Sequence, residues 1–77
     1  MKLWILQPVN SGDAMFRYDC AYGFVIRAES EKEAREMAAK QSGDEGGSTW
    51  RDPALTTCVE LKAEGEAGVM IRDFLAA

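Results

Sequence analysis

The stretch Ser30–Gly43, with the sequence SEKEAREMAAKQSG, decides the fold, because it reads as one amphipathic helix. Ser30 and Glu33 form a capping box, in which the hydroxyl accepts from the Glu33 N–H and the carboxylate reaches back to the Ser30 N–H. Gly43 follows the last periodic residue and can take the left-handed conformation that closes a helix. The sequence therefore predicts a helix whose two ends are both marked.

One face of this helix is small and mostly apolar. Its members recur at i, i+3, i+4 and i+7 and are Ala34, Met37, Ala38 and Gln41. The charged residues, Arg35 among them, lie elsewhere and form acid-first i,i+4 pairs, each of which stabilises a helix by about 0.2–0.5 kcal/mol. Because a helix this short is marginal alone, we expect its small face to dock closely against a sheet.

Four alternating segments around the helix read as strands. They are Lys2–Val9, Tyr18–Ala28, Leu55–Leu61 and Val69–Phe74. In the third segment the pattern places Thr57 and Val59 toward the core. The order strand, strand, helix, strand, strand (β-β-α-β-β) predicts an α+β fold, a four-stranded antiparallel sheet with one helix packed on one face. The 77 residues leave room for a single domain, residues 1–77.

Composition and charge exclude several classes of protein. Hydrophobic residues make up 47% and charged residues 29% of the chain, which is typical of a folded domain. No apolar run approaches the roughly 18 residues of a membrane helix, and Met1–Val9 lacks the features of a signal peptide. We therefore expect a cytoplasmic protein without membrane contact, in the host cell cytoplasm if a phage encodes it. The net charge of −4 argues against direct nucleic-acid binding and favours a protein partner with a basic surface.

The sequence also argues against catalysis. It contains no histidine, the commonest general base at neutral pH and the commonest zinc ligand. Cys20 and Cys58 lack CxxC spacing, so we expect free thiols, with a disulfide between them as the alternative. Asp44 and Glu45 lie in a glycine-rich loop that lacks the spacing of a calcium loop, and no phosphate-binding glycine motif occurs. We expect no enzyme activity, no metal and no cofactor.

The candidate binding residues are therefore acids. They lie on the helix, in the loop after it and around the last hairpin, and are Glu33, Glu36, Asp44, Glu45, Glu60, Glu64 and Glu66. One interpretation is a solvated surface that keeps a small protein soluble. The other is a set of carboxylates that imitates the phosphates of DNA and occupies a groove lined by Lys and Arg. Trp50 covers the core in the first interpretation and anchors the interface in the second.

Three phrases, Tyr18–Ser30, Trp50–Pro53 and Ile71–Phe74, resemble short bacterial proteins of uncharacterised function. With its small size, acidic surface and strand-helix layout, the chain resembles the small inhibitors encoded by phages and mobile elements, above all anti-CRISPR proteins. The resemblance implies a non-enzymatic inhibitor that binds a basic surface of a CRISPR effector subunit and blocks DNA binding, with DNA mimicry as one mode. These proteins share no motif, so the resemblance gives no individual residue a role.

The alternative is a small bacterial interaction module or ligand carrier that uses the outer face of the sheet. A sheet covered by one helix leaves its second face exposed. We expect this face to be partly apolar because of Trp4, Leu6, Met70 and Phe74. Such a face also fits a homodimer interface, so both a monomer and a homodimer stay open.

Overall fold

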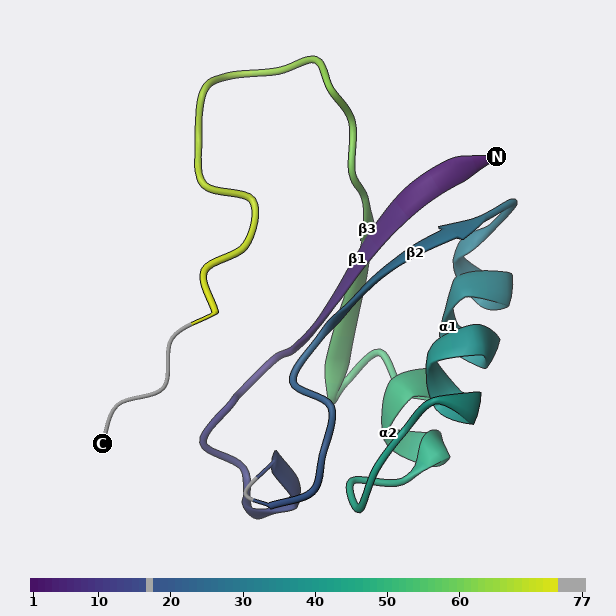
Figure 1. Cartoon of the computed structure of the whole chain (residues 1–77), viewed down its shortest axis with the longest axis vertical. Coiled ribbons are helices and arrows are strands. Elements are labelled where there is room, and N and C mark those ends of the chain that lie inside the picture. The colour runs from purple at the N-terminus through teal and green to yellow at the C-terminus, as the bar shows by residue number, and fades with distance from the viewer. Residues whose placement is uncertain (17, 74–77) are drawn as a thin grey trace.

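The computed structural model describes residues 1–16 and 18–73. Its elements follow in the order β1 (Lys2–Pro8), η1 (a 3-10 turn, Ala14–Phe16), β2 (Phe24–Ala28), α1 (Glu31–Lys40), α2 (Gly47–Arg51) and β3 (Thr56–Glu60). The strands form one antiparallel sheet in the order β2-β1-β3, and both helices lie on the same side of it (Figure 1). The α+β class is confirmed, with three strands in the described ranges where four were expected.

The central strand, β1, fixes which side of the sheet forms the core. Leu6 lies opposite Phe24 on β2 and Cys58 on β3. Residues opposite one another in antiparallel strands point to the same side of a sheet. Because Leu6 is fully buried in the core with residues of both helices, this is the helix side. The other side, which no helix covers, is the outer face.

The prediction that Thr57 and Val59 face the core is wrong. Ile5 lies opposite Val59 on the outer face, and both Thr57 and Val59 are exposed. Thr56 is fully buried instead. The alternation alone could not decide between the two faces, because each face of this strand carries polar and apolar residues.

The first turn of α1 begins at the predicted cap, where Ser30 Oγ accepts from the Glu33 N–H at 3.2 Å. Ala34 and Ala38 are fully buried, as expected for the small face. Met37, however, is exposed and Arg35 is buried. The buried stripe is rotated toward Arg35 because α2, which the sequence did not predict, packs against that side of α1.

Arg35 links three elements through its guanidinium group. Its Nη1 donates to Trp50 O at 3.0 Å and to Thr56 Oγ1 at 2.9 Å, and its Nη2 donates to Thr56 O at 3.1 Å. Its Nε donates to Glu31 Oε2 at 2.9 Å, which neutralises the charge within α1. A buried charge needs such partners, so Arg35 fixes where α2 and β3 lie relative to α1.

The short helix α2 forms in a stretch that the sequence predicts as a flexible acidic loop followed by Trp50. Five residues are too few to show a helical period, and Gly46 enters the helix with a φ of 84°, which suits glycine. The helix places Trp50 at the centre of the core. Its ring centroid lies 4.9 Å from that of Phe24 and 6.1 Å from that of Phe16, both edge-on.

The second strand is shorter than the predicted range Tyr18–Ala28, because β2 begins at Phe24. The residues before Phe24 pack against the turn after α1. The Asp44 N–H donates to Asp19 O at 2.7 Å, and a Cβ at Gly43 would lie 2.0 Å from that oxygen. The helix ends at Lys40, with Gln41 as its cap. Gly43 is therefore required for a close backbone approach, and the prediction that it closes the helix is wrong.

The predicted fourth strand is not confirmed. Residues 69–73 make no strand, and Phe74 lies outside the described residues. The Leu61 N–H still donates to Leu3 O at 2.8 Å, but the chain then leaves the sheet and crosses on the side away from the helices (Figure 1).

Replacement of Gly43 by alanine should destabilise the fold, because the new Cβ forces the Asp19 backbone away. We expect the free energy of unfolding in urea to fall by about 1–3 kcal/mol. The control is Gly68→Ala, where the nearest atom lies at an ordinary 3.6 Å. Equal urea midpoints for the two variants would contradict this role of Gly43.

Replacement of Arg35 by lysine keeps the charge but removes the planar set of donors. We expect the free energy of unfolding to fall by about 2 kcal/mol, the scale of hydrogen bonds to a charged group. Lys32→Arg, an exposed change on the same helix, should leave the urea midpoint unchanged. A wild-type midpoint for Arg35→Lys would show that the guanidinium geometry is dispensable.

Candidate functional site

The two acidic loops lie at opposite ends of the molecule. The loop of residues 61–66 is at the top of Figure 1, and the turn of residues 41–46, between α1 and α2, is at the bottom. The molecule is 34 Å long. Glu64 and Glu66 are therefore far from Asp44, although all three are exposed. The structure does not bring these predicted binding residues together.

Glu45 and Trp50 lie inside the protein. The Glu45 carboxylate accepts from the Gly43 N–H at 2.8 Å, from the Ala21 N–H at 3.2 Å and from Trp50 Nε1. Both side chains are buried, Trp50 completely. They stabilise the turn after α1 and the core, and a partner cannot reach them in this structure.

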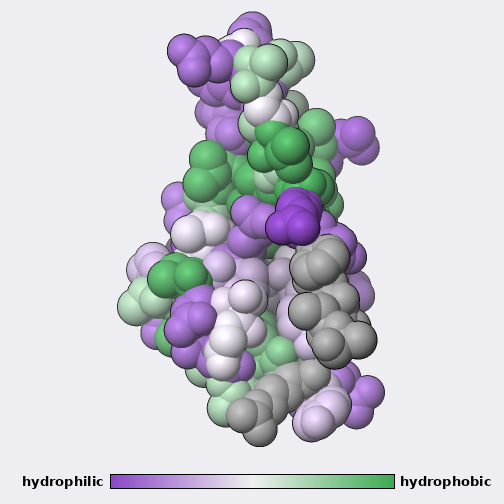
Figure 2. Space-filling model, turned by 90° about the vertical axis from the view of Figure 1, so that its left-hand side faces the viewer, coloured by the Kyte–Doolittle hydropathy of each residue, from purple (hydrophilic) through white to green (hydrophobic). Residues whose placement is uncertain are grey.

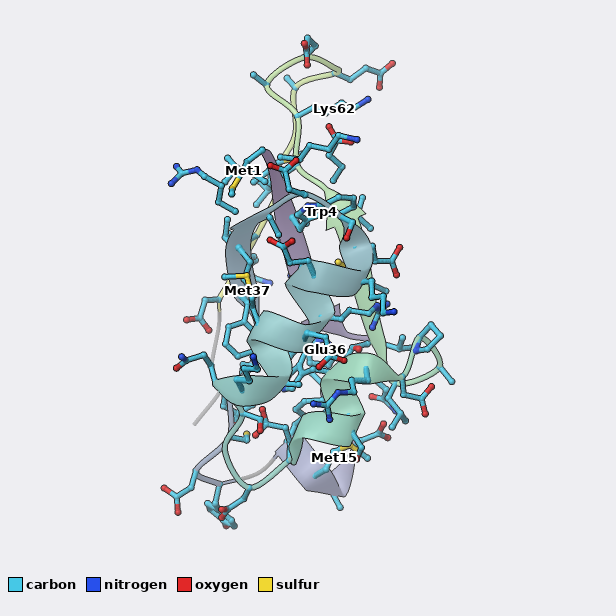
Figure 3. The ribbon with its side chains drawn as sticks, turned by 90° about the vertical axis from the view of Figure 1, so that its right-hand side faces the viewer. Met1, Trp4, Met15, Glu36, Met37 and Lys62 are labelled. Carbon is cyan, nitrogen blue, oxygen red and sulfur yellow. The ribbon has the colours of Figure 1, made fainter. Side chains whose placement is uncertain are left out.

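Two further predicted residues already have cationic partners. Glu36, labelled in Figure 3 between the two helices, accepts from Arg51 Nε at 2.9 Å and from Arg51 Nη2 at 3.2 Å. The hydrogen bond to Arg51 holds the pKa of Glu36 below its ordinary value. Glu60 lies 3.8 Å from Lys2 Nζ. Glu33 is exposed on α1, and it makes no ion pair with another residue of the described part.

The outer face of the sheet carries an apolar surface that spans all three strands. Ile5, at its centre, lies opposite Val25 on one side and Val59 on the other, and is itself buried. Val25 and Val59 are 53% and 57% exposed, and Leu3 is exposed beside them. We call Leu3, Ile5, Val25 and Val59 the outer patch. Soluble proteins rarely leave such surfaces uncovered unless they bind something.

Acidic residues border this side of the molecule at one end. The loop of residues 61–66 leaves β3 toward the outer side (Figure 1), and its Glu64 and Glu66 are exposed. Figure 2 views the molecule from this side, with the chain after β3 in front of the sheet, and shows apolar residues gathered below a hydrophilic end. Arg27, opposite Leu3, and Lys62 add positive charge near this border. The surface is thus apolar at its centre and mainly charged at one end.

Sequence reasoning missed the outer patch. It assigned Trp4 and Leu6 to the outer face, whereas both lie on the helix side, with Trp4 Nε1 donating to Ala28 O at 3.0 Å. Both faces of β1 are apolar, so the alternation of residues along this strand could not show which face lies against the helices. The signal that would have helped is cross-strand register, since Val25 and Val59 align with Ile5 only when β1 is central.

The two cysteines are not joined by a disulfide in the structure. Cys20 and Cys58 are free and half-buried. Burial, and next the charge of Glu31, raise the pKa of the Cys58 thiol, which keeps it protonated at neutral pH. A hydrogen bond with Cys20 raises the pKa of Tyr22. Within the described ranges, no group of three or more potential ligands is placed to hold a metal ion, and no helix is long and apolar enough to cross a membrane.

The Glu36–Arg51 pair should make stability depend on pH. The pKa of Glu36 is lower in the folded protein than its ordinary value of 4.5. The pair therefore stabilises the fold at pH values above 4.5, and this stabilisation is lost as the pH falls through the pKa of Glu36 in the folded protein. We expect the melting temperature of Glu36→Gln to lie below that of the wild type at pH 7 and to approach it at acid pH. Glu66→Gln, which removes an exposed loop carboxylate, is the control. A gap that persists at acid pH would contradict the pair's contribution.

Comparisons of the chain with protein-family profiles, with curated proteins and with solved structures give no match.

Proposed function

We infer that this chain is a non-enzymatic binding protein that covers a basic surface of a larger protein, acting as an inhibitor of the anti-CRISPR type. The single observation that carries this proposal is the outer patch with the exposed Glu64 and Glu66 at its border. The partner that fits such a surface is a protein with an apolar contact area and Lys or Arg beside it. The net charge of −4 argues against nucleic acid itself as the ligand.

The layout of the surface resembles that of known protein interfaces. These have an apolar centre from which water is excluded and a polar border that stays accessible. Leu3, Val25 and Val59 supply the exposed apolar residues around the buried Ile5, across the three strands. Since the strands are paired with one another, the patch is rigid, and binding costs little conformational entropy.

Glu64 and Glu66, in the charged border, give the choice of partner. Carboxylates at the edge of an interface attract a basic surface and speed association, and salt weakens this attraction. Lys and Arg are also the residues with which nucleic-acid-binding proteins hold phosphates. A protein bound to such residues through Glu64 and Glu66 therefore competes with DNA for the same surface. This is how the proposed inhibitor would block target-DNA binding by a CRISPR effector complex.

The proposal is tested by target-DNA binding of candidate effector complexes, with and without the protein. We expect the wild type to lower DNA affinity at low salt and to act more weakly as salt rises. Val59→Lys should abolish inhibition, because it places a charge in the centre of the outer patch. The paired change Glu64→Lys with Glu66→Lys should weaken inhibition at least tenfold at low salt, because it replaces two attractive charges by repulsive ones.

The matched control is Glu33→Lys with Asp44→Lys. It changes the net charge by the same amount, but neither residue belongs to the outer patch or to the loop of residues 61–66. We expect this variant to inhibit like the wild type. If it loses inhibition while the Glu64 and Glu66 variant keeps it, the interface lies elsewhere on the surface. Unchanged DNA affinity with every effector complex would overturn the inhibitor proposal itself.

A further inference from the structure

The segment of residues 69–73 has the sequence pattern of a strand but no strand partner in the structure. Val69 and Ile71 alternate with Met70 and Arg72, which is the period of a strand. Val69 is 79% exposed, and Met70 and Ile71 are about half exposed. Three consecutive large apolar residues in solvent, with β-branched residues at two of the three, are an unusual feature in a chain with a small core.

The sheet has an open edge that could accept such a strand, namely β3. The Val9 N–H donates to Leu55 O and the Leu61 N–H donates to Leu3 O, so the odd-numbered residues of this region turn their backbone groups toward β1. Backbone groups alternate in direction along a strand. The backbone N–H and C=O groups of Cys58 and Glu60 therefore point away from β1, toward the open edge. Proteins usually protect an edge of this kind, because it pairs readily with another strand.

The segment and the edge are complementary in apolarity. With Val69 and Ile71 beside Val59, a fourth strand would extend the outer patch. Its alternate residues, Met70 and Arg72, would then lie on the helix side. This places Met70 beside the half-buried Cys58.

The segment does not lie at the edge of its own sheet. Ile71, Arg72 and Asp73 instead line a groove of about 870 Å³ with Gln7 and Thr57, on the outer side of the molecule. The loop of residues 61–66 carries the chain away from β3 toward that side (Figure 1). The segment of a second copy of the chain can reach the edge of β3 from outside. In a dimer with a two-fold axis, each copy then places its segment at the β3 edge of the other.

We propose that the open edge of β3 binds residues 68–73 of a second copy, which gives a dimer with an exchanged fourth strand in each sheet. Backbone hydrogen bonds supply the affinity, and the alternation of Val69 and Ile71 with Met70 and Arg72 sets the register. This inference does not depend on the inhibitory function, because it rests on backbone pairing at β3 and not on the charges of Glu64 and Glu66. Its test measures association and not DNA binding.

The test uses a cysteine pair, with the natural Cys58 as one member. In a Cys20→Ser background, Met70→Cys places a second thiol on the helix side of the exchanged strand, next to Cys58. We expect mild oxidation to give a disulfide-linked species of twice the chain mass on a non-reducing gel. Val69→Cys in the same background is the control. Its thiol faces the outer side and should give less than a tenth of that product.

Light scattering of the wild type over a range of concentrations provides the second measurement. We expect the mass to rise toward that of a dimer. The double change Met70→Pro with Ile71→Pro should return a monomer, because one of the two removed N–H groups must point to the edge. Met70→Val with Ile71→Val should keep the dimer. A wild-type monomer at every concentration overturns the proposal, and so does a Met70→Cys disulfide that forms only within one chain.

Discussion

The buried guanidinium of Arg35 is the constraint on which the arrangement of this small protein depends. It donates to Trp50 O and to both oxygens of Thr56, so α1, the end of α2 and the start of β3 must meet at one point. Because a buried charge without partners is far more costly than a missing apolar contact, few other placements of α2 and β3 are open. The face that β3 presents to the core follows from this, since Thr56 must point toward α1.

Once both helices lie on one side, the other side of the sheet carries no helix. A chain of 77 residues has too little material to cover both faces, and antiparallel sheets tolerate one exposed face. In most such sheets that face is polar. Here it carries Leu3, Val25 and Val59 around Ile5, so the structure that stabilises the core also creates the candidate binding surface.

The sequence predicts the features that local chemistry determines. The Ser30 cap, the burial of Ala34 and Ala38 on α1 and the antiparallel pairing of the first two strands follow from capping, period and a turn cluster. It misses what depends on tertiary contacts. Arg35 looks like a surface residue until Thr56 and the Trp50 carbonyl lie beside it, and α2 is too short to show a period. The same holds for the candidate site. The acids could be predicted from the sequence, whereas the outer patch could not, because it depends on the register of the three strands.

The acids show why net charge is an incomplete guide to function in a protein of this size. Glu31 and Glu36 neutralise arginines that connect the helices, and Glu45 holds three N–H groups of the turn and of the core. These carboxylates contribute to the charge of −4 but are occupied by the fold. Glu64 and Glu66 have no such internal role among the described contacts, and they lie in the loop that borders the apolar outer face. Position beside an uncovered apolar surface, more than the number of acids, therefore identifies the carboxylates that can select a basic partner.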